Sequence, residues 1–207
     1  MKGFKGKKQE DKPTYKGIVF DSYDEMYFYC WCEELLNDKI IKEFVFQPPP
    51  FQLSEQVKAE NYKQYYLTAR KKVLKEREIS INVLNDHKYT ADFLIVFTSE
   101  AFEKVKLFFD LAKIKIIANE AEGSEEVFIF VDCKPKNFKM KNMDTIFSIN
   151  RKWVFQDYGV YIHKVYFKDW FQATFAPIMY LLAGKKDSSK FINHVDFKRK
   201  YFSDDSK

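Results

Sequence analysis

The order of apolar and polar residues predicts alternating helices and strands. Apolar residues three and four apart predict helices over 22–36, 99–113, 144–158 and 169–182, the last kinked or divided at Pro177. Short apolar or alternating runs predict strands over 40–46, 92–97, 113–118, 128–134 and 160–166. Residues 51–53 are a candidate continuation of the first strand after three prolines. This order predicts an α/β (α+β) fold with a central mixed sheet flanked by helices.

The helix predicted over 144–158 has signals at both ends. Asp144 is a suitable N-cap and Gly159 a suitable C-terminal stop. Its inward stripe is predicted to be Ile146, Ile149 and Trp153. Lys152 and Gln156 stand one turn apart at the edge of this stripe, close enough to act as a pair, although an ordinary solvent-facing edge explains them equally well.

Three polar, basic segments lie outside the expected core, and they divide the chain into a basic arm, one domain and a tail. Residues 1–16 are Lys-rich and are expected to form a flexible arm, which either solubilises the chain or contacts phosphates. Residues 17–183 are expected to form a single domain. Within it, the excursion at about 55–80 mixes Lys and Arg with Tyr, as a helix or a long β-ribbon. It is either a solvated insertion or an arm that touches phosphates and stacks on bases. Residues 184–207 are expected to form a polar tail.

Composition narrows the class of protein. The 207 residues suit one domain, and 46% hydrophobic and 18% aromatic residues exclude a disordered chain. A net charge of +5 permits an anionic partner without requiring one. No apolar run approaches membrane-spanning length and there is no signal peptide, so we expect a soluble, cytoplasmic protein with no membrane partner.

Several familiar kinds of site are excluded by the residues. The cysteines, Cys30, Cys32 and Cys133, are unevenly spread, which fits a reduced compartment and core positions, and they complete no zinc pattern. With six glycines, the chain has no Walker or dinucleotide-binding pattern. No nucleophile is arranged in sequence with any of the three histidines, which argues against hydrolysis by a Ser-His-Asp or Cys-His site.

Acidic residues at the ends of predicted elements carry the remaining chemistry. Asp132 and Lys134 end an apolar strand and point to one side of it, with Cys133 on the other side. Asp92 begins another strand. Glu25 begins the inward face of the first helix, but it also completes a capping box with Ser22, which by itself explains its presence. A strand that meets solvent at a charged pair likewise explains Asp132 and Lys134.

Taken in this order, the four residues resemble the PD-(D/E)XK nuclease superfamily. Its core is a helix, antiparallel strands, a helix and a final strand, and the match covers roughly residues 17–166. The sequences Phe20-Asp21-Ser22-x-x-Glu25 and Tyr89-x-x-Asp92-Phe93 look like those of small phage-type endonucleases and Holliday junction resolvases. Two departures are Ala91, where the namesake proline would stand, and the long interval between Asp92 and Asp132.

This resemblance implies a restriction-endonuclease-like core and a metal-dependent DNA endonuclease that hydrolyses phosphodiester bonds. Mg²⁺ or Mn²⁺ would be held by Glu25, Asp92, Asp132 and the Cys133 carbonyl, since such ions take hard oxygen ligands. Lys134 would act on the attacking water. DNA contacts would come from Lys136, Lys139, Lys152 and Gln156.

The resemblance also implies branched or structured DNA as the substrate, a role in phage recombination or DNA processing, and a homodimer. One alternative is a catalytically inactive nuclease-fold protein that binds DNA or belongs to a phage virion. The other is a different enzyme class or a protein-interaction module, in which Glu25 is only a cap and Asp132 only a strand-end charge.

Overall fold

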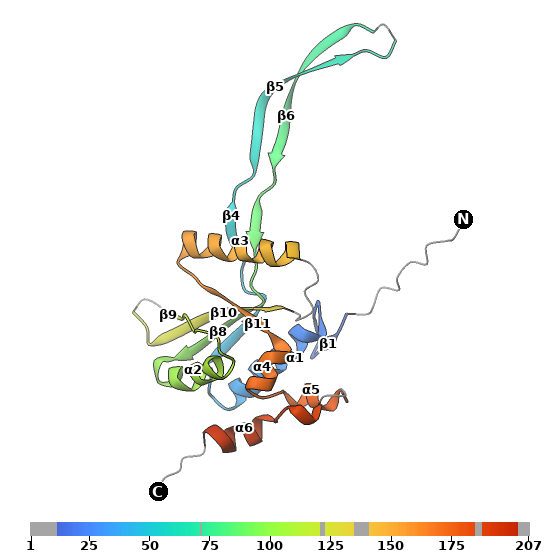
Figure 1. Cartoon of the computed structure of the whole chain (residues 1–207). Coiled ribbons are helices and arrows are strands. Elements are labelled where there is room, and N and C mark those ends of the chain that lie inside the picture. The colour runs from blue at the N-terminus through green and yellow to red at the C-terminus, as the bar shows by residue number, and fades with distance from the viewer. Residues whose placement is uncertain (1–11, 71, 121–122, 135–140, 185–187, 203–207) are drawn as a thin grey trace, which may run out of the picture.

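The computed structural model describes residues 12–70, 72–120, 123–134, 141–184 and 188–202, and its fold mixes α-helices with several sheets, most of them antiparallel (Figure 1). The helical segments are α1 (Tyr23–Asn37), η1 (Ser99–Ala101), α2 (Phe102–Leu111), α3 (Lys141–Tyr158), α4 (Phe167–Ala173), α5 (Ile178–Leu182), η2 (Ser188–Lys190) and α6 (His194–Tyr201). In the part of the chain so described, no helix combines the length and apolarity needed to cross a bilayer.

The central sheet has the strand order β11-β10-β8-β3, with the short β9 paired to β10. Its strands are β3 (Glu43–Phe46), β8 (Phe93–Thr98), β9 (Asn119–Glu120), β10 (Glu126–Lys134) and β11 (Ile162–Tyr166). The pairs β3·β8 and β8·β10 are antiparallel, whereas β10·β11 is parallel. Because parallel neighbours need a crossover, the chain passes through α3 between β10 and β11.

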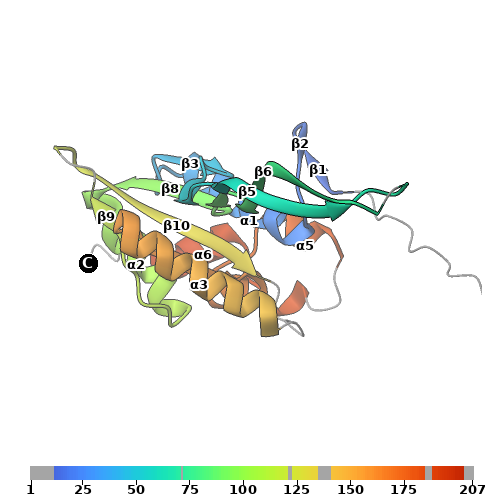
Figure 2. The ribbon, with the colours of Figure 1, turned by 90° about the horizontal axis from the view of Figure 1, so that it is seen from above.

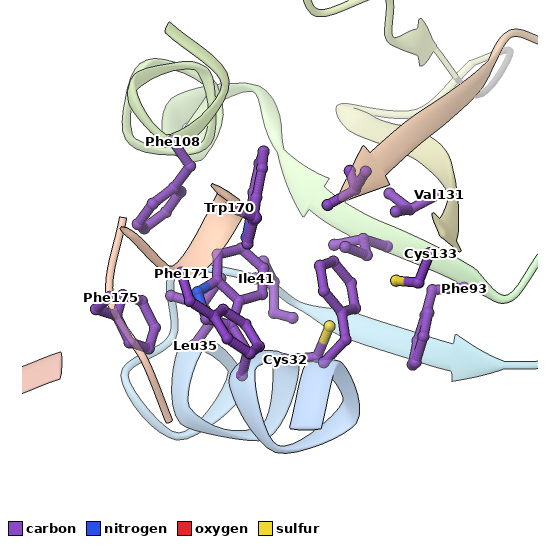
Figure 3. Close-up of a cluster of buried hydrophobic side chains, with 14 of the residues drawn as sticks. Cys32, Leu35, Ile41, Phe93, Phe108, Val131, Cys133, Trp170, Phe171 and Phe175 are labelled. Atoms are coloured by element: carbon purple, nitrogen blue, oxygen red, sulfur yellow. The ribbon is translucent and has the colours of Figure 1, made fainter. Parts of the chain in front are cut away.

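The two faces of this sheet pack against different layers. Val131 and Cys133 of β10 join the larger core with residues of α1, α2 and α4, and Figure 3 shows this cluster around Trp170. Phe130, one residue away on the strand, belongs to a smaller core with Phe147 and Val154 of α3. The alternation of side chains along β10 therefore places the sheet between α3 on one side and the other helices on the other (Figures 1 and 2).

The polar excursion is a two-stranded β-ribbon that extends far beyond α3 (Figure 1). Its antiparallel strands are β5 (Val57–Leu67) and β6 (Leu74–Leu84), and at its base β4 (Phe51–Ser54) pairs antiparallel with β7 (His87–Tyr89). Of the two forms that the sequence allows here, a helix or a ribbon, the ribbon is observed.

Both ends of the chain contribute to the body of the protein. Residues 12–16 of the expected arm include β1 (Thr14–Tyr15), which forms a hairpin with β2 (Ile18–Val19), while residues 1–11 lie outside the described residues. Beyond residue 183, the boundary expected from the sequence, Phe191 and Phe197 are buried in the larger core. The core therefore includes α6, although the polar character of this segment gives no sign of this in the sequence.

Three local expectations are wrong. Residues 113–118 form no strand; the short β9 begins at Asn119. Helix α3 begins at Lys141, so Asp144 lies in its first turn and is not the N-cap. The inward stripe of α3 is formed by Phe147, Asn150 and Val154; of the predicted stripe, Trp153 packs against the smaller core, whereas Ile146 and Ile149 are exposed. Both stripes have the same three-and-four spacing, so only contact with the sheet distinguishes them.

The other element predictions agree well with the structure. Helix α1 begins after Ser22, whose side chain accepts a hydrogen bond from the Glu25 N–H. Gly159 follows α3 with a φ of +68°, as expected for a left-handed stop. The predicted C-terminal helix is divided into α4 and α5, and Pro177 is the residue before α5.

Candidate functional site

The end of β10 holds a buried ion pair. Asp132 is only 1% exposed, and Lys134 is half-buried with its Nζ in close contact with Asp132 Oδ1. The two side chains therefore lie on the same side of the strand, as their spacing predicts, with Cys133 buried on the opposite side. Burial also raises the pKa of the Cys133 thiol, which fits its place as a core residue.

Asp92 meets this pair from the neighbouring strand. It precedes β8, whose antiparallel register with β10 pairs Phe93 with Val131. The Cys133 N–H donates to Asp92 Oδ2 over 2.6 Å, and the Asp132 carboxyl lies close enough to act on Asp92 through its charge. Burial, together with the negative charge of Asp132, raises the pKa of Asp92 to about 8. With its pKa raised above neutrality in this way, Asp92 keeps its proton at pH 7.

Tyr89 is a further member of the site, beyond the residues predicted from the sequence to hold the metal or act on water. It lies on β7, at the base of the ribbon, and its hydroxyl donates to Asp132 Oδ2 in a buried hydrogen bond. Burial and the charge of Asp132 raise the pKa of the Tyr89 hydroxyl well above its usual value, so it remains a donor. Its place in the Tyr89-x-x-Asp92 sequence is the only signal that points to it.

Glu25 lies on α1 with both of its carboxylate oxygens engaged in the helix cap. Ser22 Oγ lies 3.1 Å from Glu25 Oε1, and the Asp21 N–H donates to Glu25 Oε2 over 3.2 Å. Burial raises the pKa of Glu25, while the charge of Lys134 opposes that rise, which places the carboxylate within electrostatic reach of the site. Even so, the described part of the chain contains no group of three His, Cys, Asp or Glu side chains placed to hold a metal ion. Of the three acids expected to converge, only Asp92 and Asp132 therefore meet, and Glu25 does not join them.

A cluster of basic residues lies beside the acids on the α3 side of the sheet. Lys164 of β11 is paired in register with Asp132, and parallel neighbours in register project to the same face. The ring of Phe147 is approached by three cations, Lys134 at 5.5 Å, Arg151 at 5.4 Å and Lys164 at 5.8 Å. Lys164 also pairs with Asp144. Lys164 and Arg151 are not predicted from the sequence, because nothing local indicates that β11 lies beside β10.

The structure says less about the other residues that were expected to contact DNA. Lys152 and Gln156 are exposed on α3, and Lys152 lines a shallow depression with Asp144, Thr145, Ser148 and Ile149. Lys136 and Lys139 lie outside the described residues. At Cys133, the structure assigns a role to the backbone N–H, which binds Asp92, while the carbonyl was the expected ligand.

The donor set fits a divalent cation held by two carboxylates. Asp132 Oδ1 is buried and accepts no hydrogen bond, although the Lys134 ammonium is near it. Carboxylate oxygens are the ligands that Mg²⁺ prefers, and that ion is commonly held by one or two of them together with water. A cation in this position would replace the proton on Asp92, and would relieve the same electrostatic repulsion.

Comparisons of the chain with protein-family models, with curated proteins and with solved structures gave no match.

Proposed function

We propose that this protein is a Mg²⁺- or Mn²⁺-dependent DNA endonuclease of the PD-(D/E)XK type, acting on branched or structured DNA. The observation that carries the proposal is the contact of Asp92 with Asp132, and of Asp132 with Lys134. These residues come from two strands that are far apart in sequence. The same three positions are the ones at which the resemblance requires two acids and a lysine.

The order and pairing of the elements support the proposal. Helix α1 precedes the antiparallel strands β3, β8 and β10, and α3 then leads to the parallel strand β11. This is the sequence of a helix, antiparallel strands, a helix and a final strand that the resemblance implies. The ribbon, with its base strands, is an insertion between β3 and β8, and α2 with β9 is an insertion between β8 and β10.

Each side chain of the site has a role in phosphodiester hydrolysis. Asp92 and Asp132 would hold the cation, which when bound polarises the scissile phosphate and lowers the pKa of a bound water. The Lys134 ammonium would orient the attacking water and stabilise the negative charge that develops on the phosphate. Tyr89 and the Cys133 N–H hold the two carboxyl groups in place. Lys164 and Arg151 would contact neighbouring phosphates.

Cleavage of defined DNA substrates tests this proposal. A four-way junction, a flap and a plain duplex are incubated with the protein and Mg²⁺, Mn²⁺ or EDTA. We expect cleavage that requires the cation and favours the branched substrates. Lys134→Ala and Asp132→Asn are each expected to lower the rate by on the order of 100-fold or more, because each removes a charge that acts on the transition state.

Two variants of α2 serve as matched controls. Lys106→Ala and Asp110→Asn make the same chemical changes at a half-buried and an exposed position on the other side of the sheet, and we expect them to cleave at the wild-type rate. Cleavage that survives both Lys134→Ala and Asp132→Asn would assign the activity to a different site. DNA binding by a well-folded protein without any cleavage would instead support a nuclease-fold DNA-binding protein.

A further inference from the structure

The two faces of the β-ribbon differ in charge. In the register of β5 with β6, Tyr62 pairs with Ile79, Gln64 with Arg77, and Tyr66 with Lys75. Because side chains alternate along a strand, these six residues share one face, here called the cationic face. The intervening pairs join Lys63 to Glu78, Tyr65 to Glu76, and Leu67 to Leu74, and form the mixed face.

Side-chain contacts agree with this division. On the cationic face, the Arg77 guanidinium lies 5.4 Å from the centre of the Tyr66 ring, and its Nε donates to Gln64 Oε1 over 2.8 Å. On the mixed face, Lys63 pairs with Glu76 at 2.7 Å. Among these six cross-strand pairs, which the structure describes in full, the cationic face has two basic residues and no acid. The mixed face has one basic and two acidic residues.

The ribbon is fixed to the body close to the candidate site. The Tyr158 hydroxyl of α3 donates to the carbonyl oxygen of Gln52 in β4 over 2.6 Å. The Nε2 of His87 in β7 lies 2.9 Å from Oδ1 of Asn150 in α3. Two residues beyond His87, Tyr89 donates to Asp132. The same short strand thus joins the base of the ribbon to the candidate site, and the ribbon extends outward from the α3 side (Figures 1 and 2).

We infer that the cationic face of the ribbon binds double-stranded DNA beside the candidate site. Lys75 and Arg77 would contact phosphates, with exposed Tyr62 and Tyr66 against the sugars and groove edges. Strands of 11 residues, at about 3.3 Å per residue, extend roughly 35 Å, which is close to one turn of B-DNA. A two-stranded ribbon also fits the major groove.

A polyanion explains the ribbon better than a second copy of this chain does. Two copies meeting through their cationic faces would bring Lys75 and Arg77 of each together without an acid to pair them. At the tip, exposed Arg70 and Lys72 extend the basic surface. The inference rests on the proposed function for the choice of DNA, but binding itself requires no cleavage.

The test measures binding of a labelled 30-base-pair duplex by fluorescence anisotropy in EDTA, so that the DNA stays intact. Lys75→Gln/Arg77→Gln is compared with Lys58→Gln/Lys63→Gln, which removes the same charge from the mixed-face side of the same ribbon. We expect the first double variant to weaken binding by on the order of tenfold at moderate salt and to lower the salt slope by about 2. The second is expected to change affinity less than about twofold.

Equal losses in the two double variants would show that only total charge matters, and would overturn the inference. It would also fail if neither variant loses affinity, or if the ribbon variants abolish self-association or RNA binding while DNA binding persists. Thermal unfolding is measured for every variant, because these exposed substitutions should leave it unchanged. Loss of cleavage with intact, face-dependent binding would count against the nuclease proposal alone.

Discussion

Asp92 and Asp132 place two acidic side chains close together at the candidate site. Asp132 is buried with the half-buried Asp92 beside it, and the proton that Asp92 retains at neutral pH offsets their repulsion. Such an arrangement opposes folding at neutral pH unless the proton or a cation remains. The contact is consistent with a site that gives up some stability for chemistry.

Asp92→Asn tests this view of the pair. The amide keeps an oxygen to accept from the Cys133 N–H and presents an N–H₂ group to Asp132, so the repulsion disappears. Without cations, we expect the variant to be more stable than wild type by roughly 1–3 kcal/mol, measured by urea unfolding at pH 8. With Mn²⁺ at a hundredfold excess over its Kd, the wild type should gain roughly 2–3 kcal/mol and the variant almost nothing.

Asp110→Asn on α2 is the control for Asp92→Asn, and it should show the wild-type response to Mn²⁺. An equal gain in stability from Mn²⁺ in wild type and in Asp92→Asn would contradict the assignment of Asp92 as a ligand.

The same residues show how far local sequence can identify the site. Alternation along β10 was enough to place Asp132 and Lys134 on one side, and the apolar run after Asp92 was enough to start a strand there. Tyr89 and Lys164 were not identified, because each reaches Asp132 from a strand whose position depends on the packing of the whole domain.

At the scale of elements, Glu25 has two competing roles at the start of helix α1. The residue completes the N-terminal cap with Ser22, and it lies within electrostatic reach of Lys134. A capping box accepts Gln in place of Glu, so one substitution separates the roles.

We expect Glu25→Gln to change the free energy of unfolding by less than about 0.5 kcal/mol, because Gln can make the same capping hydrogen bonds. Cleavage of a four-way junction should fall by no more than a few-fold, since both carboxylate oxygens already serve the cap. Ser22→Ala is the comparison, and loss of its cap should cost about 1 kcal/mol. A loss of cleavage above 100-fold at unchanged stability would make Glu25 a metal ligand after all.

Helix α3 shows what element-level patterns leave open. Its extent was predicted to within one turn, yet its inward face is offset by one residue from the predicted one, of which only Trp153 packs against the core. Phe147 and Val154 face the sheet, while Ile146 and Ile149 are exposed. Apolar residues occupy both stripes at the same spacing, so the period alone identifies the helix without identifying its buried face.

At the scale of the whole molecule, His163 connects the sheet to the segment before β9. Its side chain is fully buried, and its Nε2 lies 2.8 Å from the carbonyl oxygen of Ile117. Burial lowers the pKa of His163, and the nearby Arg151 lowers it further. The folded state therefore binds fewer protons at this residue than the unfolded chain does.

This difference predicts that stability falls as the pH drops below about 6.5, because the unfolded state then gains a proton that the folded state resists. The stability that neutral His163 contributes is complete above about pH 6.5, and it is lost as the pH falls toward the lowered pKa of the folded state. Urea unfolding of wild type and His163→Gln between pH 5 and pH 7.5 measures it. We expect wild type to lose more stability than the variant over this range. Parallel pH profiles would contradict the assignment.

The sequence by itself determined the local features of this protein: the capped start of α1, the strand that ends in Asp132 and Lys134, the stop at Gly159 and the division at Pro177. These features depend on neighbouring residues, whose spacing and chemistry the sequence states directly. Only the tertiary structure decided that Asp92 touches Asp132, that Lys164 lies beside them, that the excursion is a ribbon with one cationic face, and that α6 belongs to the core. Each of these depends on which distant segments pack together, and that is set by burial and strand pairing over the whole chain.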